Sequence, residues 1–176
     1  MPKEYVILVD KDDLPIGSEE KMEAHRRALL HRAISVFIVN SKGEWLIQRR
    51  ATAKYHSGGL WTNTCCTHPQ LGESTAQAAK RRLLFEMGMD CRIKHLFSFI
   101  YCQPLDNEMT ENELDHVFVG ICDDLPLINP DEVMAYRYID TASLNADMDA
   151  NPANYTVWFK IIAQRVQQEI AQSGIA

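Results

Sequence analysis

Two apolar segments joined by a short turn constrain the fold of this chain most strongly. Residues 33–40 are rich in valine, isoleucine and phenylalanine, and residues 44–50 continue in this way after the turn at 41–43. β-Branched and aromatic residues favour strands, and a glycine-containing turn between two such runs favours a β-hairpin. We therefore expect a hairpin whose second strand carries Arg49 and Arg50 to one end.

Further segments have the character of strands or helices. Strands are expected at 5–9, 96–102, 114–121 and 135–139, where β-branched and aromatic residues lie between turn-forming residues. A helix is expected at 76–87, because N-cap residues precede it and Gly88 follows. Residues 155–171 have apolar side chains at four-residue intervals, which predicts an amphipathic helix.

The order of these elements predicts an α/β (α+β) fold with a mixed β-sheet flanked by helices. The local structure of residues 20–32 stays open, and residues 104–107 are expected to form a loop. No repeat or linker divides the chain, and 176 residues with 46% hydrophobic content suit one domain over residues 1–176.

Charge and composition exclude several classes of function. The net charge of −6 argues against broad binding to nucleic acid or acidic membranes and favours a small-molecule partner. Residues 1–5 lack the basic and apolar regions of a signal peptide, and no apolar run is long enough to cross a bilayer. We expect a cytoplasmic protein without membrane insertion, with a monomer favoured.

A thiol, an imidazole and two glycines are concentrated in residues 59–73, which we expect to form a loop. Cys66 lies two residues before His68, and such a pair can be a nucleophile with its base, two metal ligands or two structural neighbours. The chain has five cysteines, an odd number, and Cys65 adjoins Cys66, which favours reduced thiols. A catalytic role for Cys66 and a purely structural role for both cysteines stay open on the residues alone.

Imidazoles and carboxylates that suit divalent zinc, manganese or magnesium occur at His25, His31, His68, Glu111 and Glu113. Side chains of Glu111 and Glu113 point to the same side if their segment is extended, because strand residues alternate between faces. Isolated histidines in polar surroundings are more often surface or hydrogen-bonded residues. A metal site and this simpler alternative both remain open.

Four basic residues, Lys21, Arg50, Lys54 and Arg82, could bind an anion, with Glu86 holding a bridging Mg²⁺. Arg82 and Glu86 lie one turn apart on the expected helix, so their side chains are neighbours. Glu86 is in the last turn, where the helix dipole disfavours a negative charge, which indicates a role other than helix stability. Basic residues at strand ends are usually only solvated, so the pattern alone is weak.

Taken together, these segments resemble the type I isopentenyl-diphosphate isomerases, a family of the Nudix-fold superfamily. The resemblance is carried by residues 30–37, 55–61, 81–83, 86–88 and 111–113 and by the run Thr62-Asn63-Thr64-Cys65-Cys66-Thr67-His68-Pro69. The ordered combination spans nearly the whole chain and is highly specific. It implies a Nudix-like mixed sheet flanked by helices.

The box by which Nudix hydrolases bind Mg²⁺ is altered in this chain. Thr67 stands in place of its first glycine, and Arg82 and Phe85 replace two of its glutamates. The retained positions are Glu73, Arg81, Glu86 and Gly88. A hydrolase that gathers Mg²⁺ on several carboxylates would be crippled by these losses, so the resemblance implies a kept fold with changed chemistry.

The resemblance also implies a role for each candidate residue. Cys66 and Glu113 match the proton-transfer pair, Tyr101 a supporting hydroxyl beside the carboxylate, and Trp158 an indole over a developing cation. The metal ligands are matched by His25, His31, His68, Glu111 and Glu113. The diphosphate-binding positions are matched by Lys21, Arg50, Lys54 and Arg82, with Glu86 on the Mg²⁺ that the diphosphate also binds.

The implied reaction interconverts isopentenyl and dimethylallyl diphosphate through a tertiary carbocation and supplies isoprenoid biosynthesis. The implied cofactors are Mg²⁺ with the diphosphate and one divalent ion, Mn²⁺, Zn²⁺ or Mg²⁺, at the histidines. The main alternative is a Nudix pyrophosphohydrolase acting on a nucleoside diphosphate derivative. A non-catalytic, metal-stabilised protein that binds a diphosphate is an alternative of a different class.

Overall fold

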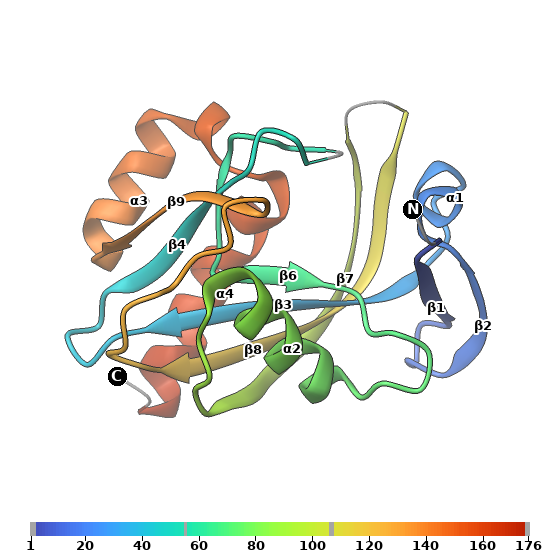
Figure 1. Cartoon of the computed structure of the whole chain (residues 1–176), viewed down its shortest axis with the longest axis horizontal. Coiled ribbons are helices and arrows are strands. Elements are labelled where there is room, and N and C mark those ends of the chain that lie inside the picture. The colour runs from blue at the N-terminus through green and yellow to red at the C-terminus, as the bar shows by residue number, and fades with distance from the viewer. Residues whose placement is uncertain (1–2, 55, 106–107, 175–176) are drawn as a thin grey trace.

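Strand β3 (His31–Val39) lies at the centre of the sheet in the computed structural model, which describes residues 3–54, 56–105 and 108–174 (Figure 1). The other strands are β1 (Tyr5–Val9), β2 (Pro15–Glu20), β4 (Trp45–Arg50), β5 (Trp61–Thr62), β6 (Cys65–Thr67), β7 (Ile93–Pro104), β8 (Thr110–Ile121) and β9 (Val133–Ile139). The helices are α1 (Lys21–Arg26), α2 (Thr75–Met87), α3 (Thr141–Ala150) and α4 (Val157–Ser173), with a 3₁₀ turn at Pro152–Asn154.

The sheet is mixed because β3 has parallel and antiparallel neighbours. It pairs in parallel with β8 along its whole length and antiparallel with β6, β1 and β4. In the β3–β8 register His31 lies opposite Glu113, and in the β3–β6 register Ser35 lies opposite Cys66. These registers bring three segments that are distant in the sequence to one region of the sheet.

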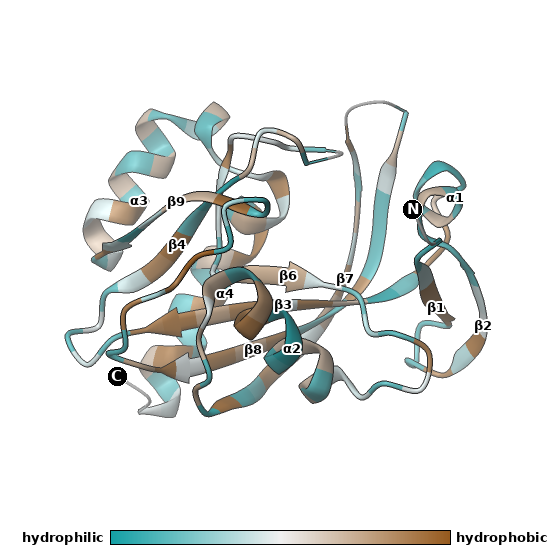
Figure 2. Cartoon of the chain, viewed as in Figure 1, coloured by the Kyte–Doolittle hydropathy of each residue, from teal (hydrophilic) through white to brown (hydrophobic). Residues whose placement is uncertain are grey.

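Alternate residues of β3 enter two separate hydrophobic cores. Ile34, Val36 and Ile38 pack in the core under α2, whereas Phe37 and Val39 pack in the core under α4. Figure 2 shows hydrophobic residues along almost the whole of β3. Helices α2 and α4 therefore cover opposite faces of the sheet, and the predicted mixed sheet flanked by helices is confirmed.

The two long predicted helices are also confirmed. Ser74 caps α2 by accepting from the Gln77 backbone N–H at 3.2 Å, and the Gln77 side chain accepts from the Ser74 N–H at 2.9 Å. Gly88 ends the helix in the left-handed region at φ 63°, where a Cβ would lie 2.5 Å from the Leu127 carbonyl oxygen. The predicted apolar stripe of α4, from Trp158 to Ile170, is buried.

The predicted hairpin at 33–50 forms only at its closed end, where Ile38 pairs with Leu46 and Val39 with Trp45. Beyond these pairs, the Thr64 hydroxyl accepts from the Ile38 N–H at 2.8 Å and donates to the Leu46 carbonyl at 2.7 Å. The two strands diverge at this bridge. The space between them admits β6 beside β3 and β5 beside β4.

Two expectations for the connecting segments need correction. Residues 59–73 are not all loop, because the short strands β5 and β6 form within them, and α3 lies where no element was expected. Of the loop expected at 104–107, residues 106 and 107 lie outside the described residues. Among the described helices, none is both long enough and apolar enough to span a bilayer.

Candidate active site

A cavity of about 770 Å³ gathers most of the predicted site residues. This volume is typical of a small-molecule site. The predicted residues in its wall are Lys21, Arg50, Lys54, Cys66, His68, Arg82, Tyr101, Glu111, Glu113 and Trp158. The other predicted residues, His25, His31 and Glu86, are buried and contact wall residues from behind.

Three imidazoles and one carboxylate form a cluster in which the ligand atoms of His25, His31, His68 and Glu113 lie within 4.8 Å of one another. Oε1 of Glu113 lies 3.1 Å from His68 Nε2, 3.5 Å from His31 Nε2 and 4.0 Å from His25 Nε2. Ligands that share one ion at ~2.1 Å are themselves roughly 3 to 3.4 Å apart. The cluster therefore needs only a small contraction to hold one divalent ion.

Backbone carbonyls fix the tautomer of two of these imidazoles. His25 Nδ1 donates to the Lys21 carbonyl oxygen and His31 Nδ1 to the Leu29 carbonyl oxygen, each at 2.7 Å. A carbonyl only accepts, so Nδ1 carries the hydrogen and Nε2 presents a lone pair towards Glu113. Metal-binding histidines are commonly oriented in this way, and the residues fit a divalent ion.

The electrostatics of the cluster favour neutral imidazoles. Burial lowers the pKa of His68 to about 4, and burial followed by the charge of His31 lowers the pKa of His25. The neutral form is the one that binds a metal.

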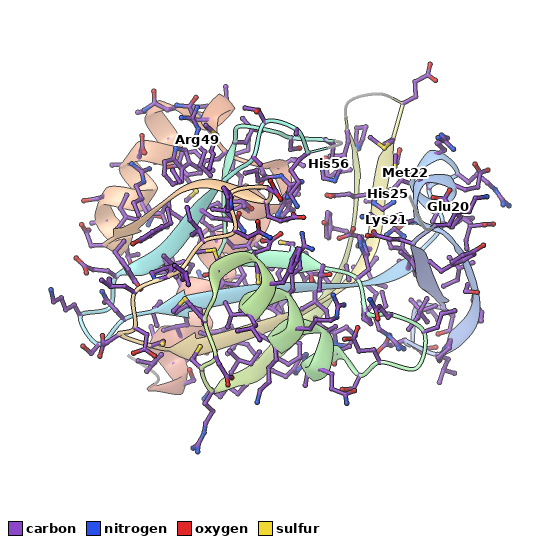
Figure 3. All side chains as sticks on the ribbon, viewed as in Figure 1. Glu20, Lys21, Met22, His25, Arg49 and His56 are labelled. Carbon is purple, nitrogen blue, oxygen red and sulfur yellow. The ribbon has the colours of Figure 1, made fainter. Side chains whose placement is uncertain are left out.

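Helix α1, which carries His25, is held at its start by Glu20, whose carboxylate accepts from the Met22 and Glu23 N–H groups at 3.1 Å (Figure 3).

Glu111 lies outside this group of four. Its segment is extended, as the prediction required, and Glu111 and Glu113 share one face of β8. The Tyr101 hydroxyl lies 2.9 Å from Glu111 Oε2 and 2.7 Å from Glu113 Oε2. The hydroxyl hydrogen makes a strong bond to only one of these acceptors, and the second short contact is satisfied best when the other carboxyl group is protonated and donates to the tyrosine oxygen.

The two pKa shifts identify that donor as Glu111. Burial, then the charge of Glu113, raises the pKa of Glu111 to about 9. Burial would also raise the pKa of Glu113, but the adjacent imidazoles of His31 and His68 outweigh it and hold that pKa well below its usual range. Glu111 as a metal ligand therefore stays a prediction, because in this arrangement its carboxyl group carries the proton.

Cys66 faces the cavity because β6 is a strand and its residues alternate. Cys65 points the other way and is a residue of the core under α2. The Cys66 sulfur lies 3.6 Å from the Ser35 hydroxyl and 3.2 Å from Asn63 Nδ2, and Ser35 donates to Asp115 at 2.7 Å. Burial, then the charge of Asp115, raises the pKa of Cys66 to about 12. The thiol is therefore protonated at neutral pH.

Trp158, in the first turn of α4, is held in the cavity wall by contacts on several sides. Its Nε1 donates to Asn63 Oδ1 at 3.3 Å, and the Arg50 Cζ lies 5.3 Å from the ring centroid. His56 packs edge-on against the ring, with centroids 5.5 Å apart. The ring already lies within cation–π distance of a guanidinium, which indicates that its π-face is accessible to positive charge.

His56 was not among the predicted site residues. Its Nε2 lies 3.9 Å from Glu111 Oε1, and burial, then the charge of Arg50, lowers its pKa to about 3. In Figure 3 it faces Lys21 and His25 from the segment between β4 and β5. No spacing rule marks this residue, and Tyr55 beside it in the same motif lies outside the described residues.

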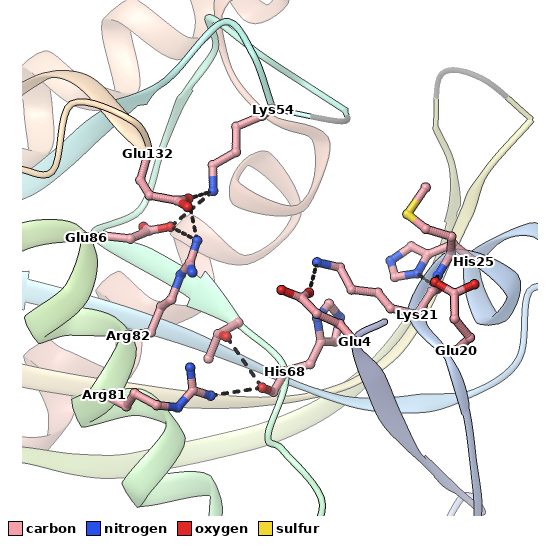
Figure 4. A network of polar contacts seen from close by, with 12 residues as sticks. Glu4, Glu20, Lys21, His25, Lys54, His68, Arg81, Arg82, Glu86 and Glu132 are labelled. Atoms are coloured by element: carbon pink, nitrogen blue, oxygen red, sulfur yellow. Dashed lines mark hydrogen bonds and ion pairs between the residues drawn. The ribbon is translucent and has the colours of Figure 1, made fainter. Parts of the chain in front are cut away.

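The side chains of Lys54 and Arg82 lie together, and both pair with two carboxylates (Figure 4). Lys54 Nζ lies 3.4 Å from Glu86 Oε1 and pairs closely with Glu132, while Arg82 pairs with Glu86 and lies 2.6 Å from Glu132 Oε2. Glu132, just before β9, was missed because no motif marks it. We call Lys54, Arg82, Glu86 and Glu132 the cation cradle.

The other predicted diphosphate-binding residues, Lys21 and Arg50, line the same cavity as this cradle. Lys21 reaches into the cavity from α1, where its Nζ lies 2.8 Å from Glu4 Oε2 (Figure 4). Glu86 is buried and accepts from Gln48 Nε2 at 2.6 Å, which fixes the carboxylate of the last helical turn. Buried contacts of this kind account for a negative charge where the helix dipole disfavours it.

The altered Nudix box keeps one structural pair. Glu73 accepts from Arg81 at 2.7 and 2.9 Å, and Arg81 also donates to the His68 carbonyl oxygen at 3.3 Å. These bonds tie the start of α2 to the histidine of the cluster. Phe85, in place of a box glutamate, is 51% exposed and cannot serve as a metal ligand.

Comparison with known proteins extends these observations. A family model described as the NUDIX domain matches residues 29–159. An "Isopentenyl-diphosphate Delta-isomerase" of Pectobacterium atrosepticum is 49% identical over 94% of this chain and 93% of its own length. An "Isopentenyl-diphosphate Delta-isomerase 2" of Photorhabdus laumondii is 51% identical over 90% of each chain.

A solved structure supports the fold alone. The crystal structure of DR0079 from Deinococcus radiodurans superposes with a TM-score of 0.73 at 20% identity, covering 92% of this chain and 98% of that protein. With a Nudix match over most of its length and relatives near half identity, this chain belongs to the isopentenyl-diphosphate Delta-isomerase family of the Nudix fold.

Proposed function

We propose that this chain interconverts isopentenyl and dimethylallyl diphosphate. The observation that carries the proposal is that one cavity holds Cys66, Glu113 and Trp158 next to a cluster of cationic side chains. Cys66 and Glu113 enter it from β6 and β8, which lie on either side of β3. The names of the similar proteins point to the same reaction.

The reaction needs two proton transfers on a five-carbon chain. A proton is added to an alkene carbon, a tertiary carbocation forms, and a proton leaves the allylic carbon, so hydrogen and charge balance. We assign one of these transfers to Cys66 and the other to Glu113, and holding the alkene between them supplies much of the acceleration. Trp158 stabilises the cation by about 0.5 to 2 kcal/mol, and water must be kept out of the cavity because it would capture the cation.

The metal ions have separate places in this proposal. His25, His31, His68 and Glu113, with Glu111 as a predicted fifth ligand, would hold Mn²⁺, Zn²⁺ or Mg²⁺, and Glu86 would hold Mg²⁺ beside the diphosphate. When bound, such ions orient carboxylates, alter their acidity and neutralise phosphate charge. The diphosphate is the handle whose binding energy fixes the alkene between the two proton-transfer groups.

The test of this function is hydrogen exchange. Metal-loaded protein incubated with isopentenyl diphosphate in D₂O is expected to place deuterium at the allylic and methyl positions, which NMR detects. Absence of deuterium uptake would remove the proposal. Release of phosphate from nucleoside diphosphate derivatives would instead favour a hydrolase, and tight substrate binding without exchange a non-catalytic protein.

A second prediction concerns the cation cradle. Arg82→Ala and Lys54→Ala are each expected to raise KM by about 10- to 100-fold, since a charged hydrogen bond is worth about 1.5 to 3 kcal/mol. Lys80→Ala is a matched control, because Lys80 is an exposed cation on the same helix that does not line the cavity. Equal KM values for Arg82→Ala and Lys80→Ala would contradict the assignment.

We extend the proposal to the whole chain and its compartment. Residues 1–176 are proposed to form one isomerase domain, since the match to the relatives covers most of the sequence. All five cysteines are free, which suits the reducing conditions of the cytoplasm, where we place the activity.

A further inference from the structure

Asn63 connects two residues to which the proposed function gives direct roles. Its side chain is fully buried in the turn between β5 and β6 and contacts both the Cys66 thiol and the Trp158 indole. We infer that Asn63 is a positioning residue that sets the thiol and the indole at a fixed separation. This inference rests on the proposed function and gives a role to Asn63, which lies in the run Thr62–Pro69 but had no role assigned to it.

The orientation of the Asn63 amide is dictated by its neighbours. Nδ2 donates to the carbonyl oxygens of Val36 at 3.1 Å and Cys65 at 3.0 Å, which can only accept. Oδ1 accepts from the Trp158 indole N–H at 3.3 Å, which can only donate. The amide therefore cannot be flipped without breaking three contacts.

The Cys66 thiol lies against both ends of this amide. Its sulfur is 3.2 Å from Nδ2 and 3.3 Å from Oδ1 of Asn63. Both Nδ2 hydrogens already bond to carbonyl oxygens, so the sulfur shares one of them in a three-centre bond, while the amide oxygen can accept the thiol hydrogen. Asn63 can thus hold the sulfur in one place before and after it gives up or gains a proton.

The indole side is held by a second set of contacts. Thr62 donates to Asn63 Oδ1 at 2.9 Å and accepts from the Thr156 hydroxyl at 2.9 Å, and the Thr156 N–H donates to the Trp61 carbonyl oxygen at 2.9 Å. Thr156 is the N-cap of α4, two residues before Trp158. These bonds join the start of α4 to β5 and to the turn that carries Asn63, so the positions of the indole and the thiol are coupled.

A buried asparagine can also serve stability alone, and the bonds to Val36 and Cys65 have that character. The contacts with Cys66 and Trp158 predict something more specific. Losing them should slow the reaction without weakening diphosphate binding, because no hydrogen bond or ion pair seen among the described residues joins Asn63 to the cation cradle. A displacement of about 1 Å at reacting groups can cost roughly 100-fold in rate.

The experiment compares Asn63→Ala with Thr64→Val. Thr64 is the next residue and equally buried, and its hydroxyl makes two buried hydrogen bonds that link β3 to β4 without contact with Cys66 or Trp158. For folded, metal-loaded protein we expect Asn63→Ala to lower kcat by about 10- to 100-fold with KM within about twofold of wild type. Thr64→Val should lower thermal stability but leave both constants within about twofold.

A third variant decides the matter where Asn63→Ala does not fold. Thr62→Val keeps the shape of the side chain but removes the hydroxyl that donates to Asn63 Oδ1, so kcat should fall several-fold at constant KM. The inference is overturned if Asn63→Ala has the same kcat as Thr64→Val, or, where Asn63→Ala does not fold, if Thr62→Val has the same kcat as Thr64→Val. It is also overturned if the variant changes only KM and leaves kcat at the wild-type value. Deuterium exchange by the wild-type protein tests the proposed function separately, so the two failures are distinguishable.

Discussion

Replacing Cys66 by alanine is expected to lower the rate of isomerisation by about 100- to 10,000-fold, the range typical of a lost general acid or base. The thiol lies in the cavity wall with its sulfur against Asn63 and Ser35. Alanine leaves no group at this position that can exchange a proton with the substrate. The measurement is deuterium uptake from D₂O by metal-loaded protein, together with a thermal melt to confirm folding.

Cys65→Ala is the matched control for this prediction. Cys65 is the adjacent cysteine and is buried, but it points into the core under α2. Its loss should lower stability and leave turnover largely intact. Near-normal exchange by Cys66→Ala, or equal losses in the two variants, would refute a proton-transfer role for Cys66.

Removal of the divalent metal is expected to abolish activity and to lower the free energy of unfolding. An ion that binds only the folded chain stabilises it by about 4 kcal/mol when present at roughly 1,000 times its dissociation constant. Without the ion, three imidazoles and the Glu113 carboxylate remain packed within 4.8 Å. Dialysis against a chelator, elemental analysis, a thermal melt and the exchange assay measure each part of this prediction.

The control for the metal prediction uses another histidine. His68→Ala should reduce the bound metal, because its Nε2 lies 3.1 Å from Glu113 Oε1. His116→Ala should not, because His116 pairs with Asp13 at 3.1 Å and lies outside the cluster. Full activity after the metal has been removed, or equal metal content in both variants, would count against the site.

The larger elements of the fold could be predicted because their patterns extend over many residues. Strand β3 and helices α2 and α4 repeat their apolar positions several times, and α2 has its cap residues in the sequence. Strands β5 and β6 have two and three residues, too few to show a period. Helix α3 buries only Leu144, so its sequence carries almost no amphipathic signal.

The opening of the predicted hairpin could not be foreseen either. It depends on the Thr64 hydroxyl, which bonds to Ile38 and Leu46, residues 26 and 18 positions away. Local propensity does not contain such a contact. Local patterns predicted strands β3 and β4 correctly, but they predicted the pairing between these strands only in part.

The types of residue in the candidate site could be predicted from the sequence. The contacts between those residues could be predicted only in part. The resemblance supplied the residues now found in one cavity, including His68, which contacts Glu113 rather than forming a dyad with Cys66. Glu132, His56 and Asn63 were missed because their roles arise from contacts between distant segments. A lone glutamate, histidine or asparagine has no spacing that distinguishes it from many others in the chain.

The cation cradle has a consequence for how a ligand enters the cavity. Glu86 and Glu132 already act as counterions to Lys54 and Arg82, so these cations are held in place before a diphosphate arrives. Binding is then an exchange of one anion for another, in which the incoming phosphates compete with an internal carboxylate. Ligands with several negative charges should therefore bind more tightly than ligands with one, because only a multivalent anion replaces both ion pairs at once.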